Sequence, residues 1–249
     1  MKLTIIGCAG SFPGPEAACS AYLVEAEGFR LLVDFGTGSL GALQRYGVDM
    51  HSLNGIVLSH LHADHIFDAC SYVVARRYAP QAPFPALPLY GPAGTAERLA
   101  AAYDPSEGSL DDVYQFHTLT PGTFRIGPLQ VTTERMNHPV ETYGFRIEHN
   151  GRVLAYSADT AACDALVRLA HRADLFLCEA SYLDSTDNPS GLHLTGKEAG
   201  EHATKAGVRR LTLTHLVQAW GSETQTLAEA RSTFAGPIEI ARPGAVFEV

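Results

Sequence analysis

The segment Ser59-His-Leu-His-Ala-Asp-His65 places three histidines and one aspartate within six consecutive positions. Imidazole and carboxylate groups are the ligands that zinc and similar divalent metals prefer in proteins. Two alternating histidines, His60 and His62, followed by the adjacent Asp64 and His65, suit two metals that lie close together. A solvated polar loop is the alternative interpretation. The composition and spacing favour the core of a two-metal hydrolytic site.

Apolar strands are expected to position this cluster and its missing partners. Residues 53–59 form a continuous apolar run that ends at the histidines, and strand ends of α/β proteins commonly carry chemistry. Four residues cannot fill two coordination spheres, so further ligands are expected at other strand ends. Three candidates each follow an apolar run: His138, Asp159 and His215. Each alone is more commonly structural, but their joint recurrence favours a ligand role.

The remaining hydrophobic periodicity predicts strands and helices in alternation. Predicted strands cover residues 3–6, 21–26, 30–34, 53–59, 87–90, 123–126, 129–135, 143–149, 153–157, 175–179, 211–214, 238–241 and 245–249. Predicted helices cover residues 36–46, 66–78, 93–103, 163–171, 195–206 and 224–233. This pattern indicates an α/β protein with a single domain over residues 1–249, built from two similar halves that join near residues 104–122.

The composition limits the function classes. The chain has 249 residues, 46% of them hydrophobic, and a net charge of −9, with no basic run longer than Arg76-Arg77 and Arg209-Arg210. A broad nucleic-acid footprint is therefore not expected. Five cysteines without a Cys-x-x-Cys pair indicate neither a disulfide framework nor a thiolate zinc site. No apolar run has the length of a membrane span, and we expect a cytoplasmic protein without a membrane partner.

In its ligand pattern the chain resembles the metallo-β-lactamase superfamily, matched in order by His-x-His-x-Asp-His at 60–65, His138, Asp159 and His215. The resemblance spans nearly the whole chain and implies an αββα four-layer sandwich with the site at one edge of two facing sheets. It implies one metal held by His60, His62 and His138, a second held by Asp64, His65 and His215, and Asp159 as the bridge. Asp34 matches the superfamily's early aspartate, a hydrogen-bond partner that orders a loop.

Two divalent metals are the implied cofactors, with zinc expected and manganese or iron compatible with the same ligands. Two dications that share an oxygen lower the pKa of bound water to about 7, which makes hydrolysis the expected reaction. A redox use of the same fold, as in flavodi-iron proteins or persulfide dioxygenases, is the competing class. The lack of a flavodoxin-like segment and the full two-metal ligand set argue against it.

Residues 175–182 and 193–199 resemble the Glu-Ala-(Ser/Thr) and His-x-Thr-x-x-x-Ala motifs of the phosphodiesterase branch, which contains ribonuclease Z and cyclic-nucleotide phosphodiesterases. The resemblance implies that His193 donates a hydrogen bond or proton to the phosphoryl or leaving oxygen and that Glu179 orients its ring. Alternatively, His193 caps the helix that begins at Thr195. The predicted catalytic residues are Asp64, His193 and Glu179, and the predicted substrate contacts are Ser181 and Ser20.

Departures from ribonuclease Z indicate a small substrate. Where that enzyme carries Pro-Thr-Lys-x-Arg-Asn before a serine, residues 13–20 read Pro-Gly-Pro-Glu-Ala-Ala-Cys-Ser, without either basic residue. The Gly-Leu-Pro-Gly signature after His65 and a long basic insertion are also missing. Because tRNA binding needs several phosphate contacts from Lys or Arg, we predict a small phosphodiester, a 3′,5′-cyclic nucleotide opened to the nucleoside monophosphate.

Several alternatives stay open at this point. One is a ribonuclease Z-like tRNA endonuclease acting on RNA, and another is a non-catalytic metal-binding module that kept the fold. The loop from Gly10 to Gly14 either faces phosphate with its backbone amides or is a tight turn. Trp220, Tyr182 and Phe67 are candidates for stacking on a base. A homodimer is compatible with the resemblance.

Overall fold

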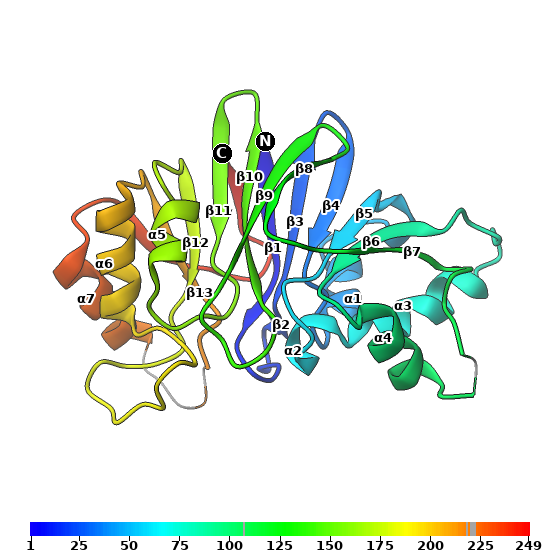
Figure 1. The fold of residues 1–249 in the computed structure, drawn as a ribbon, viewed down its shortest axis with the longest axis horizontal. Coiled ribbons are helices and arrows are strands. Elements are labelled where there is room, and N and C mark those ends of the chain that lie inside the picture. The colour runs from blue at the N-terminus through cyan, green and yellow to red at the C-terminus, as the bar shows by residue number, and fades with distance from the viewer. Residues whose placement is uncertain (107, 218, 220–222) are drawn as a thin grey trace.

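The computed structural model describes residues 1–106, 108–217, 219 and 223–249. Its centre is a pair of β-sheets that face each other, and helices cover the outer side of each sheet (Figure 1). Helices α1, α3 and α4 lie on one flank and helices α5, α6 and α7 on the other. The chain is therefore a four-layer α/β/β/α sandwich.

The first sheet has the strand order β15-β1-β3-β4-β5-β6-β7, with β2 paired to β1. Its strands are β1 (Lys2–Ala9), β2 (Ala18–Cys19), β3 (Ala21–Ala26), β4 (Phe29–Val33), β5 (Gly55–Val57), β6 (Leu87–Gly91), β7 (Tyr114–Thr118) and β15 (Val246–Glu248). Its helical segments are α1 (Ser39–Arg45), η1 (Met50–Ser52), α2 (Ala63–Ile66), α3 (Asp68–Arg77) and α4 (Thr95–Tyr103).

The second sheet has the order β14-β13-β12-β11-β10-β9-β8. Its strands are β8 (Gly122–Ile126), β9 (Leu129–Arg135), β10 (Tyr143–His149), β11 (Arg152–Tyr156), β12 (Leu175–Glu179), β13 (Leu211–Thr214) and β14 (Ile238–Ile240). Its helices are α5 (Asp164–Leu169), α6 (Gly196–Ala206) and α7 (Glu223–Thr233). The chain thus passes from the first sheet to the second between β7 and β8, and β15 returns to the first.

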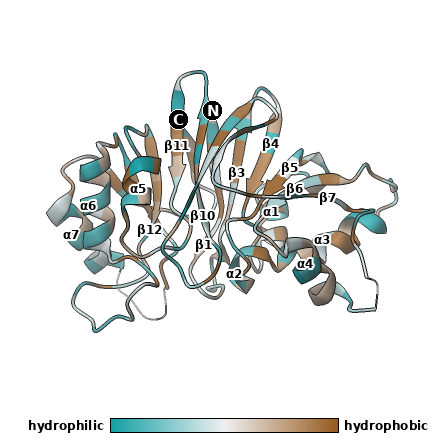
Figure 2. Ribbon diagram, in the orientation of Figure 1, coloured by the Kyte–Doolittle hydropathy of each residue, from teal (hydrophilic) through white to brown (hydrophobic). Residues whose placement is uncertain are grey.

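Three apolar clusters hold the layers together. The central cluster joins the two sheets and includes Ile5 and Val24 of the first sheet and Phe145 and Leu177 of the second, all at most 1% exposed. Each of two outer clusters joins one sheet to the helices that cover it. In Figure 2 many residues of the strands are hydrophobic, whereas the helices on both flanks mix hydrophilic and hydrophobic residues. Burial of both sheet faces explains why central strands such as β5 and β12 are apolar runs.

Strand direction brings the polar strand ends to one edge of the sandwich. Strands β11, β12 and β13 are mutually parallel, and β9 runs in the same direction because β10 is antiparallel to both of its neighbours. In the first sheet β4 and β5 are parallel. The residues that follow these strands therefore meet at one edge, as ligand sites of open α/β sheets do.

The predicted fold is confirmed, and several strands, such as residues 129–135 and 211–214, have the predicted bounds. Two details were wrong. Asp64 and His65 lie in the short helix α2 rather than in a loop. The crossing between the sheets lies within residues 104–122, but this stretch also contains a strand that was not predicted, β7, which among the described residues pairs only with β6 and has exposed residues such as Gln115. An edge strand buries too little to produce a clear apolar pattern.

No helix in the described ranges is long and apolar enough to cross a membrane.

Replacing Phe145 with Ala tests the central layer. Phe145 is fully buried between the sheets, and removing such a ring leaves a cavity that costs about 3–5 kcal/mol. We expect the free energy of unfolding, measured by equilibrium urea denaturation, to fall by that amount. The matched control is Val74→Ala at a side chain that is 49% exposed, where the expected change is about 0.5 kcal/mol. Equal losses in the two variants would contradict the layer assignment.

Candidate metal centre

The predicted ligand residues converge at the common edge of the two sheets. His60 and His62 follow β5, Asp64 and His65 lie on α2, His138 follows β9, Asp159 follows β11, and His215 follows β13. Their ligand atoms form two groups in which all atoms lie within 4.8 Å of one another, and each group could hold a metal ion. The groups share one residue, Asp159.

The first group contains His60, His62, His138 and Asp159. Nδ1 of His62 lies 3.1 Å from Nε2 of His60 and 3.2 Å from Nε2 of His138. Oδ2 of Asp159 lies 3.7 Å from Nε2 of His60. Three imidazole nitrogens and one carboxylate oxygen thus surround one point.

The second group contains Asp64, His65, Asp159 and His215. Nε2 of His215 lies 3.2 Å from Nε2 of His65 and 3.1 Å from Oδ2 of Asp64. The other oxygen of Asp159, Oδ1, lies 3.2 Å from Nε2 of His65. Asp159 therefore directs one oxygen to each group.

These spacings fit bound metals. Tetrahedral zinc with ligands at 2.0–2.1 Å places neighbouring ligand nitrogens roughly 3.3 Å apart. Oδ1 of Asp159 is buried and makes no hydrogen bond to any described residue, which is costly unless a cation satisfies it. A core held by apolar contacts or hydrogen bonds would not gather these nitrogen and oxygen ligand atoms around two points.

The outward ring nitrogens of four histidines have partners that fix the rings. Nδ1 of His138 donates to the Leu192 carbonyl at 2.9 Å, and Nδ1 of His65 donates to Oδ2 of Asp34 at 2.8 Å. The Nδ1 atoms of His60 and His215 lie 3.0 Å from Ser59 Oγ and 2.9 Å from Ser181 Oγ. Such outer contacts leave Nε2 of each ring directed inward, as in metal-binding histidines.

The electrostatics agree with this arrangement. Burial, together with the like charge of His65, holds the pKa of His60 well below its usual value, and burial lowers the pKa of His62 and His138. These imidazoles are therefore neutral and keep a lone pair for a metal. Burial opposes ionisation of Asp159, but the charges of His215 and His65 hold its pKa well below the usual range. The first group thus combines the anionic carboxylate of Asp159 with three neutral nitrogen donors.

Glu179 and His193 lie beside both groups. Nδ1 of His193 donates to Oε1 of Glu179 at 2.9 Å, and the His193 ring lies 5.5 Å from the rings of both His138 and His215. Burial acts to lower the pKa of His193, but the charge and hydrogen bond of Glu179 raise it to about 9. The predicted alternative, that His193 caps a helix, is wrong because Thr195 caps α6 in a capping box with Glu198.

Comparison with known proteins gives the family. A family model described as the beta-lactamase superfamily domain matches residues 30–216. The chain belongs to this superfamily. The probable metallo-hydrolase YhfI of Bacillus subtilis is 32% identical over 266 residues and is covered completely, as is this chain. The crystal structure of that metallo-beta-lactamase fold protein superposes with a TM-score of 0.89 over 99% of each chain.

Two mycobacterial proteins are also similar to the present chain. Protein Rv1339 of Mycobacterium tuberculosis is 43% identical over 257 residues, which cover all of this chain and 92% of that protein. Ribonuclease Z of Mycobacterium bovis is 32% identical over 267 residues, which cover 96% of this chain and 95% of that enzyme. The hydrolase therefore has the metallo-β-lactamase fold that its strand-end ligands indicated.

Ser181 and Ser20 occupy different surroundings in the hydrolase. Ser181 Oγ donates to Oε2 of Glu179 at 2.9 Å and lies the same distance from Nδ1 of His215, so it links these two side chains. Ser20 is fully buried, and its hydroxyl accepts and donates no hydrogen bond among the described residues. A substrate contact by either serine stays a prediction.

The loop from Gly10 to Gly14 uses its amides within the protein. The amide of Ser11, whose φ is 62°, donates to Oδ2 of Asp64 at 2.8 Å, and the amide of Gly14 donates to the Ala17 carbonyl at 2.9 Å. A Cβ on Gly10 would lie 2.4 Å from the His215 carbonyl oxygen. The loop is thus a tight turn packed on the ligands, which favours the second of its two interpretations.

Sequence reasoning missed several groups that orient the ligands. The Leu192 carbonyl and the Ser11 amide are backbone groups, which carry no residue signature. Tyr156 donates from its hydroxyl to Oδ2 of Asp34 at 2.8 Å across the two sheets. Ser59 could have been found, because it directly precedes the first histidine. Trp220, a candidate for base stacking, lies outside the described residues.

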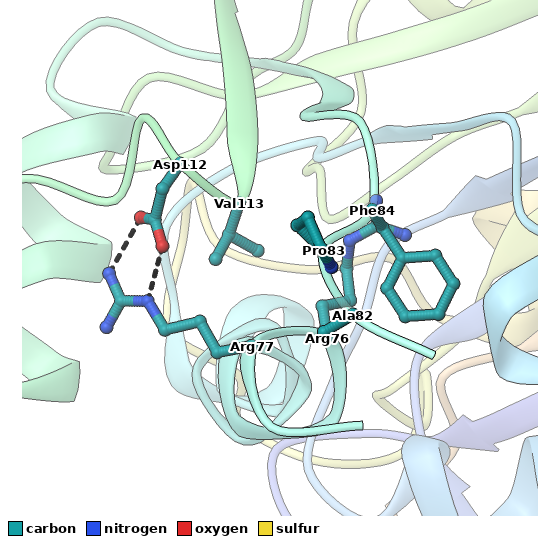
Figure 3. Close-up of a pocket in the computed structure, with 7 residues that line it drawn as sticks. All are labelled: Arg76, Arg77, Ala82, Pro83, Phe84, Asp112 and Val113. Atoms are coloured by element: carbon teal, nitrogen blue, oxygen red, sulfur yellow. Dashed lines mark hydrogen bonds and ion pairs between the residues drawn. The ribbon is translucent and has the colours of Figure 1, made fainter. Parts of the chain in front are cut away.

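A separate cavity of about 360 Å³ lies at the end of α3 (Figure 3). Asp112 in its wall is bound by Nε and Nη2 of Arg77 at 2.6 and 2.7 Å, and the Arg76 guanidinium lies over the Phe84 ring. None of the potential metal-binding groups found among the described residues includes a residue of this wall. The hydrolase's candidate centre is therefore the histidine cluster at the sheet edge.

Replacing Asp34 with Asn tests whether this buried carboxylate orients the ligands. Asp34 Oδ2 accepts hydrogen bonds from Nδ1 of His65 and from Tyr156, and an amide nitrogen there would oppose these donors. We expect metal affinity, measured by competition with a chromophoric chelator, to fall about 10- to 100-fold. Tyr156→Phe, which removes one donor and leaves His65 in place, is the control and should lower affinity less. Unchanged affinity in the Asn variant would refute the orienting role.

Proposed function

We propose that this hydrolase is a two-metal phosphodiesterase that opens a small phosphodiester, a 3′,5′-cyclic nucleotide, to the nucleoside monophosphate. The observation that carries the proposal is the Glu179–His193 pair, an imidazole held at 2.9 Å by a buried carboxylate beside both metal-ligand groups. A phosphodiester has a poor leaving group, an alkoxide, and its departure is the step that such an acid accelerates.

The proposed ligand sets follow the two groups at the sheet edge. His60, His62 and His138 would hold one metal, Asp64, His65 and His215 the other, and Asp159 would bridge them. Divalent metals held there supply an acidified water and positive charge at the attacked phosphate. Zinc suits these nitrogen and carboxylate donors, and manganese and iron are compatible.

His193 is the proposed proton donor. Its Nδ1–H is engaged by Glu179, so Nε2–H is the group left for the substrate, and its raised pKa keeps it protonated at neutral pH. In the proposed reaction the oxygen of one water bonds to phosphorus and the bond from phosphorus to O3′ breaks. O3′ takes the His193 proton. One proton of the water restores His193, and the other leaves the product phosphate for solvent.

The surroundings of the site favour a small substrate. Each ion-pair partner of the candidate ligands and of His193 in the described residues is a histidine or a carboxylate, with no Lys or Arg among them. An RNA strand needs several phosphates bound by cations outside the reacting one. A cyclic nucleotide carries one phosphate, which the two metals and His193 suffice to bind.

Turnover assays on the metal-loaded enzyme test the proposal. We expect hydrolysis of cAMP, cGMP and bis(p-nitrophenyl) phosphate with zinc or manganese, loss of activity with a chelator and recovery on metal addition. Product analysis by chromatography should show the nucleoside 5′-monophosphate, because the proposed acid serves O3′. Precursor tRNA should stay intact.

The 32% identity with ribonuclease Z makes tRNA processing the second candidate. Cleavage of precursor tRNA just after the discriminator base, with cyclic nucleotides left unchanged, would replace the proposed function with that one. If no diester, carboxylic ester, lactam or thioester is hydrolysed, a metal-binding module without turnover gains support.

Replacing His193 with Ala separates proton donation from metal binding. We expect kcat for cAMP to fall about 10²- to 10⁴-fold, because an alkoxide leaves poorly without a proton. The loss for bis(p-nitrophenyl) phosphate should be much smaller, since p-nitrophenolate leaves without one. The control is His171→Ala, an exposed histidine with no part in the site, which should keep full activity. Equal losses on both substrates in the His193 variant would disprove the acid role.

A further inference from the structure

A polar cavity of about 460 Å³ adjoins His193 on the second sheet's side of the site. Its wall includes Asn137, Ala162, Tyr182 and Glu198 together with Thr186 and residues 188–191. Small-molecule sites in proteins have volumes of about 300–1,000 Å³, so this cavity has the size of a ligand site. The proposed function leaves it without a role.

The cavity is built from the same loops that supply the candidate ligands. Asn137 directly precedes His138, and Ala161, also in the wall, is two residues beyond Asp159. An isolated β-bridge joins Asn137 to Ala161, and another joins Tyr182 to Thr195. These bridges tie the cavity wall to the loops that carry His138 and Asp159, so a molecule in the cavity would lie beside the candidate metal groups.

The charge of the cavity does not favour a second phosphate. Among the described residues, its wall contains two carboxylates, Asp184 and Glu198, and no Lys or Arg. Lys197 Nζ lies 3.1 Å from Oδ2 of Asp184, and Oε2 of Glu198 accepts from the Thr195 amide at 2.9 Å. A neutral group that carries hydrogen-bond donors fits such walls, whereas a polyanion is repelled.

An aromatic ring lies at the boundary between the cavity and the proton donor. The Tyr182 ring is 5.2 Å from the His193 ring and nearly perpendicular to it, at 87°. Aromatic side chains stack on nucleobases regardless of the base's identity. Hydroxyl and amide groups from Ser190, Asn188 and Asn137 line the rest of the wall and can hydrogen-bond a sugar or a base edge.

We infer that this cavity is the nucleoside subsite, which takes the ribose and base while the phosphate lies at the metal groups. The inference rests on the proposed function, in which the His193 side chain lies beside O3′, and O3′ stays bonded to the ribose. The ribose therefore lies on the His193 side of the phosphate, where this cavity opens. A strand of RNA, the competing occupant, would need cations along its path.

The test fills the cavity from an exposed position in its wall. Ala162→Trp adds a bulky ring at a side chain that is exposed, and Ala101→Trp is the matched control at an exposed alanine of α4 outside the cavity. Isothermal titration of the metal-loaded proteins with AMP and with inorganic phosphate separates nucleoside binding from phosphate binding. Thermal melts verify that both variants are folded.

We expect Ala162→Trp to weaken AMP binding at least 10-fold, leave phosphate binding within twofold, and raise KM for cAMP to a similar extent. Tyr182→Ala should weaken AMP binding about fivefold and Tyr182→Phe should not, which gives a second reading that does not depend on the Trp variant. Unchanged AMP binding in Ala162→Trp, or AMP bound no more tightly than phosphate by the wild type, overturns the subsite.

The same titration separates this inference from the proposed function. If AMP binding is lost in Ala162→Trp while the wild type hydrolyses no cyclic nucleotide, the proposed function fails and the nucleoside subsite stands. If cyclic nucleotides are hydrolysed and AMP binds Ala162→Trp normally, the function stands and the subsite is refuted.

Discussion

The buried carboxylate of Asp34 is the constraint on which half of the centre depends. It accepts hydrogen bonds from the Ser59 amide and hydroxyl, from Nδ1 of His65 and from the Tyr156 hydroxyl, and it is fully inaccessible to solvent. Four donors bind this one carboxylate, so moving it is costly. Each donor left unpaired in the interior would lower the stability of the fold by about 1–3 kcal/mol. Since Tyr156 belongs to the second sheet, this contact also sets the position of one sheet against the other.

Glu179 has the corresponding role at the end of β12. Its Oε1 accepts from the Thr160 amide at 2.7 Å and from His193, and its Oε2 accepts from Ser181, which also contacts His215. One carboxylate therefore aligns the loop that follows Asp159, the proposed proton donor and a candidate metal ligand. Each sheet thus contributes one buried acid that orients imidazoles instead of reacting, and the two sheets meet where those imidazoles face each other.

The sequence was most informative where burial or metal binding requires a particular type of side chain. The fully buried strand β12 is an apolar run up to Glu179, and the fully buried strand β13 alternates leucine with threonine, so the strand ends, and the residues Glu179 and His215 near them, could be located. Edge strand β7 buries little apolar surface and was not predicted. Backbone partners such as the Ser11 amide depend on a positive φ at a serine, which no residue pattern announces. The cavity beside His193 could not be predicted from the sequence either, because its shape depends on how three loops pack.

The pairing of β15 with β1 has a consequence for how the protein is made. Residues 246–248 complete the sheet that begins with Lys2, and the second candidate metal group needs His215. A ribosome that has released residues 1–150 has therefore produced His60 and His65 but neither Asp159 nor His215. Domains acquire their structure as units during synthesis, so the candidate metal groups are completed only after Asp159, His215 and β15 have all been made. The candidate metal centre and the first sheet therefore both depend on residues that are made long after the first histidines of the cluster.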